Sequence, residues 1–180
     1  MPIRCCGGRV WICHPYNGPV TDAELYHLAE RIGRALKPRN LVLATAESCT
    51  GGWISEAITS VAGSSDWFDR GFVTYSNRAK EEMLGVRAET LAEFGAVSEQ
   101  TVAEMALGAV ARSGANVAVA VSGIAGPGGA VPGKPVGTVS FGWVVPERAP
   151  VTETRLFSGD RAEVRRRAVV FALEELLRLI

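Results

Sequence analysis

The chain has 180 residues, of which 47% are hydrophobic, and its 19 basic side chains balance 19 acidic ones. At roughly 150 residues per domain, this length predicts a single domain, and the apolar content is sufficient for a hydrophobic core. Disordered and fibrous proteins are therefore excluded. Because the formal net charge is zero, we expect no nucleic-acid partner and no attraction to an anionic membrane.

The sequence shows no pattern of a targeting segment. Its apolar runs are far shorter than the roughly 20 residues that a membrane-spanning helix needs. The N-terminus also lacks the basic-then-apolar pattern of a signal peptide. We therefore expect a cytoplasmic protein with no membrane partner, in which the four cysteines are reduced.

The beginning of the chain differs from the rest, because Gly, Pro, Cys and Trp occur there without helical or strand periodicity. We interpret residues 1–20 as an N-terminal appendage, either disordered or part of a mis-assigned start, and residues 21–180 as the domain. If the codon of Val20 is GTG, the natural chain starts near Val20, and the intact mass of the native protein tests this hypothesis. The Cys and His spacing in the appendage fits no common zinc motif, so we predict no metal.

Helices and strands alternate in the first half of the predicted domain. Thr21 followed by Glu24 forms a capping box that opens an amphipathic helix. The apolar run 41–46 predicts a short buried strand, and the ESCTGG segment then turns the chain into a second helix. The remaining elements predicted for this half are a strand over 71–75 and a helix that begins at an Asn77 N-cap and ends near Gly85.

The second half contains one helix followed by three strands and a final helix. Ser98 is the predicted N-cap of a helix that ends at Gly114, and the apolar run 116–123 predicts a strand that is buried on both faces. The later elements are a Gly/Pro-rich loop over 123–135, two antiparallel strands over 136–145 and 151–159, and a helix opened by a capping box at Asp160 and Glu163. This order predicts an α/β fold, a three-layer α/β/α sandwich with a mixed central sheet.

Ser48 is the first candidate for chemistry, because it lies on a predicted strand-to-helix turn. Such turns expose a hydroxyl beside free backbone N–H groups, which can stabilise an oxyanion. The alternative is that Ser48 serves only to cap the helix, since the segment has no G-x-S-x-G motif and no evident histidine partner. The neighbouring Cys49 is a rival nucleophile, and we predict that it is a small buried filler.

Lys80 is the second candidate. If Asn77 is the N-cap, Lys80 occupies the third helical position, where the helix dipole opposes an ammonium group. Partial burial there would lower the pKa of the lysine, as a general base for a serine hydroxyl requires near neutral pH. The alternative is a solvated surface lysine that is paired with Glu81 and Glu82. These residues alone leave both interpretations open.

Six motifs resemble, in the same order, those of the CinA C-terminal domain family, over a region from about Asp22 to Leu179. The motifs are TAESCTGG (45–52), GSSDWFDRGFVTYSNRAK (63–80), GAVSE (95–99), SGIAGPGG (122–129), KPVGTV (134–139) and FSGDR (157–161). The resemblance implies an amidase without a cofactor that hydrolyses the carboxamide of nicotinamide mononucleotide (NMN) to nicotinic acid mononucleotide and ammonia, in pyridine-nucleotide recycling. It also implies a homodimer or a higher homo-oligomer.

The same resemblance assigns catalytic roles to three residues: the nucleophile to Ser48, and the family's lysine and tyrosine to Lys80 and Tyr75. Tyr75 would relay a proton to the leaving amine or hold Lys80 in its neutral form. Backbone N–H groups near Thr50 and Gly51 would hold the oxyanion. The candidate substrate-binding residues are Thr50, Gly51, Asn77, Ser122, Gly123 and Gly126.

The glycine-rich segment after 122 is the candidate wall for the nucleotide phosphate. Glycines let backbone amides approach a ligand closely, although GPGG is also an ordinary turn sequence. Residues 130–132 (Ala-Val-Pro) depart from the more polar pattern of the family, which leaves the detailed contacts of this loop open.

Two other functions remain as alternatives on the sequence alone. The domain could sense a nucleotide without turning it over, or it could be a competence-related protein-interaction domain. A nucleophile and base together favour the enzyme, because a sensor does not need them. A thermal shift caused by ligand without turnover would favour the sensor.

Overall fold

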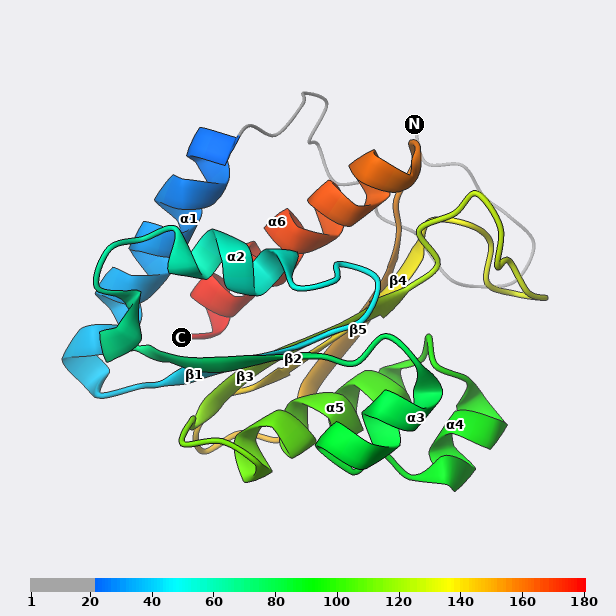
Figure 1. Ribbon diagram of the computed structural model, residues 1–180, viewed down its shortest axis with the longest axis horizontal. Coiled ribbons are helices and arrows are strands. Elements are labelled where there is room, and N and C mark those ends of the chain that lie inside the picture. The colour runs from blue at the N-terminus through cyan, green and yellow to red at the C-terminus, as the bar shows by residue number, and fades with distance from the viewer. Residues whose placement is uncertain (1–21) are drawn as a thin grey trace.

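The computed structural model describes residues 22–180, which form a five-stranded mixed sheet between two layers of helices (Figure 1). The strand order is β2-β1-β3-β4-β5; β1 pairs in parallel with β2 and β3, whereas β4 pairs antiparallel with β3 and β5. The strands are β1 (Leu43–Glu47), β2 (Phe68–Val73), β3 (Val117–Gly123), β4 (Thr138–Val144) and β5 (Val151–Leu156). The predicted sandwich, with its mixed sheet and terminal hairpin, is confirmed.

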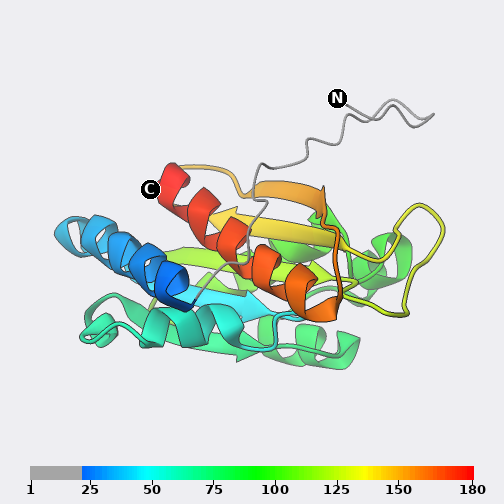
Figure 2. The same cartoon turned by 90° about the horizontal axis from the view of Figure 1, so that it is seen from above.

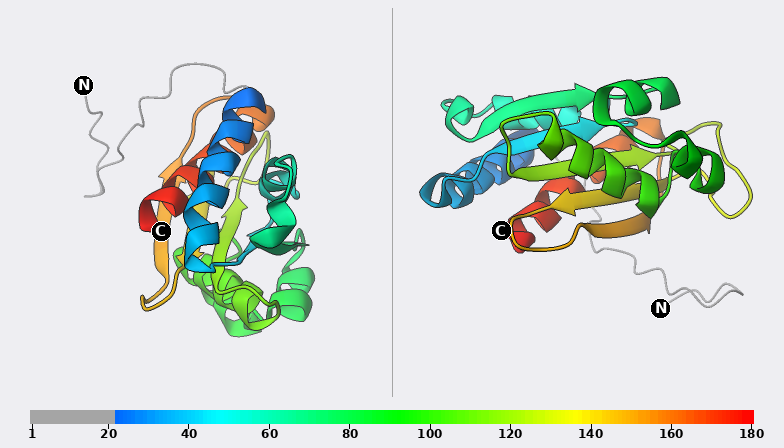
Figure 3. Two further views of the ribbon diagram at one scale, coloured as in Figure 1. Left: turned by 90° about the vertical axis from the view of Figure 1, so that its left-hand side faces the viewer. Right: turned by 90° about the horizontal axis from the view of Figure 1, so that it is seen from below.

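The helices divide between the two faces of the sheet, as the views in Figures 2 and 3 show together with Figure 1. One layer contains α1 (Asp22–Leu36), α2 (Trp53–Thr59) and α6 (Arg161–Leu179). The other contains α3 (Asn77–Ala79), α4 (Ala88–Phe94) and α5 (Glu99–Ala111). A π-helical turn, η3 (Lys80–Leu84), continues α3 directly. Within residues 22–180 no helix has the length and hydropathy needed to cross a membrane.

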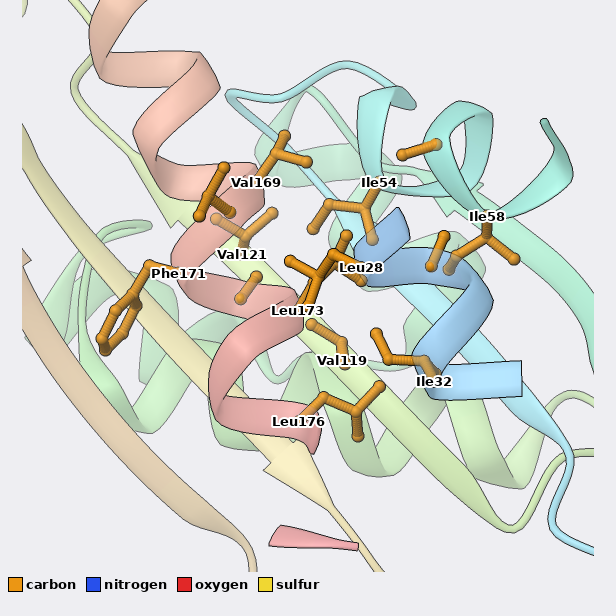
Figure 4. Close-up of a cluster of buried hydrophobic side chains, with 14 of the residues drawn as sticks. Leu28, Ile32, Ile54, Ile58, Val119, Val121, Val169, Phe171, Leu173 and Leu176 are labelled. Carbon is orange, nitrogen blue, oxygen red and sulfur yellow. The ribbon is translucent and has the colours of Figure 1, made fainter. Parts of the chain in front are cut away.

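Two hydrophobic clusters hold the layers together. The larger lies under α1, α2 and α6, where Ile32 and Leu173 meet Val119 of the sheet (Figure 4). Because side chains alternate along a strand, the neighbouring Ala118 and Ala120 face the smaller cluster beneath α5. β3 is therefore buried on both faces, as its continuous apolar sequence predicts.

Two of the predicted helix starts are confirmed by their capping bonds. The Ser98 hydroxyl accepts the backbone N–H of Thr101 at 3.2 Å, and the Asp160 carboxylate accepts that of Glu163 at 2.9 Å. Both bonds satisfy amides that a helix start leaves without a partner. Thr21, the predicted cap of α1, lies outside the described residues, as do residues 1–20.

Four elements differ from the prediction. β2 spans Phe68–Val73 rather than 71–75, because it is an edge strand in which exposed polar residues weaken the apolar pattern. The cap of α3 is Ser76, whose hydroxyl accepts the N–H of Ala79 at 3.0 Å, so Asn77 is the first helical residue. α4 is absent from the prediction, and α5 ends at Ala111, before Gly114.

The tryptophans within residues 22–180 are buried or partly buried. Trp67 and Trp143 are buried, with exposed fractions of 2% and 1%. Trp53 is partly buried, and the guanidinium groups of Arg165 and Arg166 lie over its ring at 5.3 and 4.9 Å from the centroid. Trp11 lies outside the described residues.

Candidate active site

The carboxyl ends of β1 and β3 lie side by side, and the chain leaves them in opposite directions across the sheet. In open α/β sheets, ligands bind in the crevice at such a point. Ser48 follows β1 directly, and its N–H donates to the carbonyl of Val121 at 3.0 Å. At the end of β3, a Cβ on Gly123 would lie 3.1 Å from the Sγ of Cys49. Because Gly123 has no side chain, the side chains of Cys49 and Val139 can occupy this space.

Lys80 reaches Ser48 from the helical layer that contains α3. Its Nζ atom lies 3.1 Å from the Ser48 Oγ and donates to the carbonyl of Thr74 at 2.8 Å. The side chain is 1% exposed, and this burial lowers the pKa of Lys80 from 10.5 to about 8, because the charged ammonium loses its hydration. A buried amine with this pKa can accept the proton of the neighbouring hydroxyl near neutral pH.

The surface interpretation of Lys80 does not fit this geometry. Glu81 and Glu82 are exposed, and Glu82 pairs with Arg78 rather than with the lysine. The helical position also differs from the expected one, because the Ser76 cap makes Lys80 the fourth residue of the helical segment. Burial, rather than the helix dipole, lowers the proton affinity of the amine.

Cys49 is an unsuitable nucleophile in this environment. Its side chain is 5% exposed, and burial raises the pKa of its thiol from 9.0 to about 12. Since the thiolate is the reactive form of cysteine, the thiol is inert near neutral pH. The structure therefore agrees with a small buried filler that packs against Gly123.

The turn after Ser48 presents two unpaired amides. Gly51 and Gly52 have φ values of +65° and +97°, a conformation that glycine adopts without strain. The N–H of Gly51 closes the turn by donating to the Ser48 carbonyl at 3.1 Å, so it is not free as the sequence suggested. In the described part of the chain, the N–H groups of Cys49 and Thr50 have no hydrogen-bond acceptor in another residue, and the N–H of Cys49 faces only its own sulfur. These two amides therefore remain available as donors to a ligand.

Sequence reasoning missed two residues that hold this turn. The buried carboxylate of Glu47 accepts hydrogen bonds from the turn and from the start of α2, among them one from the Thr50 hydroxyl at 2.7 Å. Arg165 of α6 donates to the carbonyls of Cys49 and Thr50 at 3.0 and 2.8 Å. A glutamate at the end of an apolar strand was the available signal, because a buried carboxylate requires several donors.

The far side of the turn borders a separate cavity of about 750 Å³ between α1, α2 and α6. Thr50, Gly51 and Gly52 line it together with Arg165, whereas Ser48 and Lys80 do not. The cavity therefore borders the turn that follows Ser48 but does not include the contact between Ser48 and Lys80.

Tyr75 is placed at the rim of the site rather than against Lys80. Its side chain is 64% exposed, and its hydroxyl accepts a hydrogen bond from the Nη2 of Arg161 at 3.1 Å. The Nη1 of Arg161 donates to the carbonyl of Gly126 at 2.7 Å. Arg161 thus links Tyr75 to the glycine-rich loop. This residue belongs to the FSGDR motif, but the sequence predicted no function for it.

The other predicted binding residues lie around the same crevice. Ser122 is buried within β3, and Gly126 begins the loop with a φ of +88°. A Cβ on Gly126 would lie 2.7 Å from Val136, so only glycine fits there. Asn77 is exposed at the start of α3. Within residues 22–180, no three or more His, Cys, Asp and Glu side chains gather as metal ligands would.

Comparisons with known proteins agree on one family. The model of the CinA C-terminal domain matches residues 25–180. Nicotinamide-nucleotide amidohydrolase PncC of Escherichia coli K12 is 55% identical over 157 residues, which cover 87% of this chain and 95% of that protein. The protein of the same name from Pseudomonas putida is 53% identical over 152 residues, with 84% and 94% covered. The crystal structure of competence/damage inducible protein CihA from Agrobacterium tumefaciens superposes with a TM-score of 0.83 at 50% identity, covering 89% and 96%.

Proposed function

The chain belongs to the CinA C-terminal domain family, and we propose that it is a nicotinamide-nucleotide amidase. It would hydrolyse the carboxamide of NMN to nicotinic acid mononucleotide and ammonia, a reaction that serves pyridine-nucleotide recycling in NAD biosynthesis. The observation that carries the proposal is the 3.1 Å contact between the Lys80 amine and the Ser48 hydroxyl at the β1/β3 crevice. The identity to amidohydrolases named PncC supports the choice of substrate.

The first half of the reaction forms an acyl-enzyme. The neutral amine of Lys80 takes the proton of Ser48, and the Ser48 Oγ attacks the carboxamide carbon of NMN. The carbonyl oxygen becomes an oxyanion, which accepts hydrogen bonds from the N–H groups of Cys49 and Thr50. The C–N bond then breaks, the leaving nitrogen takes the proton that Lys80 received from Ser48, and ammonia departs, which leaves Lys80 neutral. The product at this stage is an ester between the nicotinoyl group and Ser48.

The second half hydrolyses that ester. Lys80, neutral again, takes a proton from a water molecule, and the resulting hydroxide attacks the ester carbon. The Ser48 oxygen leaves and regains its proton from Lys80, which releases the carboxylate of nicotinic acid mononucleotide. Of the two roles that the sequence left open for Tyr75, the position at the rim favours relay of the proton to the leaving amine over support of the neutral form of Lys80, because the Tyr75 hydroxyl is bonded to Arg161 and not to the lysine.

The phosphate of NMN would bind at the side of the crevice formed by Arg161 and the glycine-rich loop. A guanidinium has five N–H donors, and the two bonds of Arg161 to Tyr75 and Gly126 leave others for phosphate oxygens. Ser122 and Gly123 at the end of β3 and the amide side chain of Asn77 would contact the ribose and the ring. Each step proposed above is carried by side chains, backbone amides and water.

We also propose that the protein assembles as a homodimer or a higher homo-oligomer. β2 is an edge strand, and Val73 at its end is 46% exposed beside the exposed ring of Tyr75. Light scattering of the purified protein tests this, and a monomer mass across the micromolar range would contradict it.

The test of function is the identity of the product. Purified protein incubated with NMN should yield nicotinic acid mononucleotide, separated from NMN by anion-exchange chromatography because the product carries one more negative charge. A thermal shift caused by NMN without product would support a nucleotide sensor instead.

A further inference from the structure

We propose that Glu47 is a positioning residue for this reaction, because its buried carboxylate fixes the nucleophile turn and leaves only the oxyanion donors unpaired. The inference rests on the proposed amidase function. Glu47 is the last residue of β1 and directly precedes Ser48, and its side chain has no exposed surface.

Both carboxylate oxygens of Glu47 are engaged with donors of the turn and of α2. Oε2 accepts the Thr50 hydroxyl at 2.7 Å and the backbone N–H groups of Gly52 and Ile54, each at 3.0 Å. Oε1 accepts the N–H and the hydroxyl of Ser55, each at 2.8 Å. These donors are all neutral, so hydrogen bonds rather than an opposite charge offset the cost of burying the carboxylate.

The carbonyls of the same turn have a different partner. Arg165 binds those of Cys49 and Thr50 at 3.0 and 2.8 Å, and the Ser48 carbonyl accepts the N–H of Gly51 at 3.1 Å. Glu47 therefore accepts hydrogen bonds from the amides that follow the turn, and Arg165 donates hydrogen bonds to two carbonyls of the turn. The N–H groups of Cys49 and Thr50, the two residues that follow Ser48, are left without an acceptor in another residue. This selective pairing pre-organises an oxyanion site.

An amide cannot replace this carboxylate. If the side-chain nitrogen that Glu47→Gln introduces faced the Oε2 position, it would oppose the N–H groups of Gly52 and Ile54; if it faced the Oε1 position, it would oppose that of Ser55. In either orientation at least one buried amide loses its acceptor, and the turn must shift to relieve the clash. Glu47→Gln is thus nearly isosteric and specifically disrupts the pairing.

The experiment compares Glu47→Gln with Glu104→Gln, a matched control. Glu104 accepts the backbone N–H of Arg87 at 2.9 Å and the hydroxyl of Thr90 at 2.7 Å, and none of its partners belongs to the Ser48 turn. Both variants should lose thermal stability. Only Glu47→Gln should lower kcat on NMN, by about 100-fold, with KM changed by less than about threefold, because the oxyanion contact exists only in the transition state.

Two further readouts separate positioning from other roles. The midpoint of the pH profile should stay near that of the wild type, since the base is Lys80; a displaced midpoint would overturn the proposal by making Glu47 a proton-transfer group. The rate at which a fluorophosphonate probe labels Ser48 should fall in parallel with kcat. Labelling requires no NMN, so it tests Glu47 even if the wild-type protein fails to hydrolyse NMN, an outcome that would refute the proposed function alone.

A kcat of Glu47→Gln within twofold of the wild type would overturn the inference. If Glu47→Gln does not fold, Thr50→Val replaces it, because this change removes only the 2.7 Å bond to Oε2 and keeps the side-chain shape. We expect Thr50→Val to lower kcat and the labelling rate by about tenfold. Unchanged values for both would overturn the role of Glu47.

Discussion

The amine of Lys80 lies 3.1 Å from the hydroxyl of Ser48, although 32 residues separate them in the chain. β1 delivers Ser48 to the crevice. Lys80 is the first residue of η3, which follows α3 directly, and a second bond to the carbonyl of Thr74 holds its amine at the crevice. Burial reduces the proton affinity of the amine, and the contact aligns it with the hydroxyl. The pair thus has the geometry and the proton affinity that the proposed nucleophile and its base require close to neutral pH.

The pH dependence of NMN hydrolysis should report the titration of Lys80. Because only the neutral amine accepts the Ser48 proton, kcat/KM should fall about tenfold per pH unit below a midpoint near 8 and level off above it. Initial rates between pH 4 and pH 10 measure this profile. A midpoint between about 4 and 7 would instead indicate a carboxylate or histidine base and would exclude the lysine.

Lys80→Met should abolish turnover and change the pH dependence of stability. The folded-state pKa is depressed from 10.5 to about 8, so the unfolded chain binds more protons between these values and the stability of the wild type rises with pH across this window. The gain is on the order of 2 kcal/mol between pH 7 and pH 10. Methionine cannot titrate, so the stability of Lys80→Met lacks this dependence on pH. In urea unfolding, the free energy of unfolding of the variant minus that of the wild type should therefore decrease by this amount between pH 7 and pH 10. Parallel pH curves for the two proteins would contradict a buried amine.

Gly123→Ala should damage the crevice. The new methyl group would lie 2.7 Å from Val139 Cγ2 and 3.1 Å from the Cys49 Sγ, so the nucleophile turn must move. We expect a loss of about 1–3 kcal/mol in the free energy of unfolding and a reduced kcat. Gly114→Ala is the control, because its methyl group would meet only Asp69, at 4.0 Å. Equal behaviour of the two variants would show that the close approach at Gly123 is unimportant.

Arg161→Ala should weaken binding of the substrate phosphate. We expect KM for NMN to rise about tenfold or more, while the kinetics on nicotinamide riboside, which lacks the phosphate, change little. Arg178→Ala, at the exposed far end of α6, should leave both substrates unaffected. If the wild type turned over the riboside and NMN equally well, the phosphate site itself would be excluded.

Ser48 and Lys80 are recognisable in the sequence for different reasons: the serine by its turn, and the lysine because it breaks a local rule. Glycines follow the serine at a strand-to-helix turn, and the lysine stands in the first turn of a helix, where acidic residues are preferred. Their mutual distance was not predictable, since it depends on how α3 packs over the strand ends. Glu47 escaped notice because its donors in α2 come together only after that helix folds back along β1.

The elements that the sequence missed depend on tertiary contacts. α4 has seven residues, of which only Thr90 and Leu91 are buried, and its N-cap Arg87 makes no side-chain capping bond. Glu104 of α5 supplies the acceptor for the Arg87 N–H instead. Neither periodicity nor a cap signal was therefore available. By contrast, long periodic segments such as α6 and the uninterrupted apolar β3 were predicted directly.

The most direct test of a serine amidase is ammonia release from NMN by the wild type, Ser48→Ala and Cys49→Ala, each with and without a chelator. We predict release by the wild type, most of that rate in Cys49→Ala, a loss of about 1,000-fold or more in Ser48→Ala, and no effect of the chelator. Activity that survives Ser48→Ala but disappears in Cys49→Ala would contradict the assignment of the nucleophile. Absence of release from all three proteins would contradict the amidase.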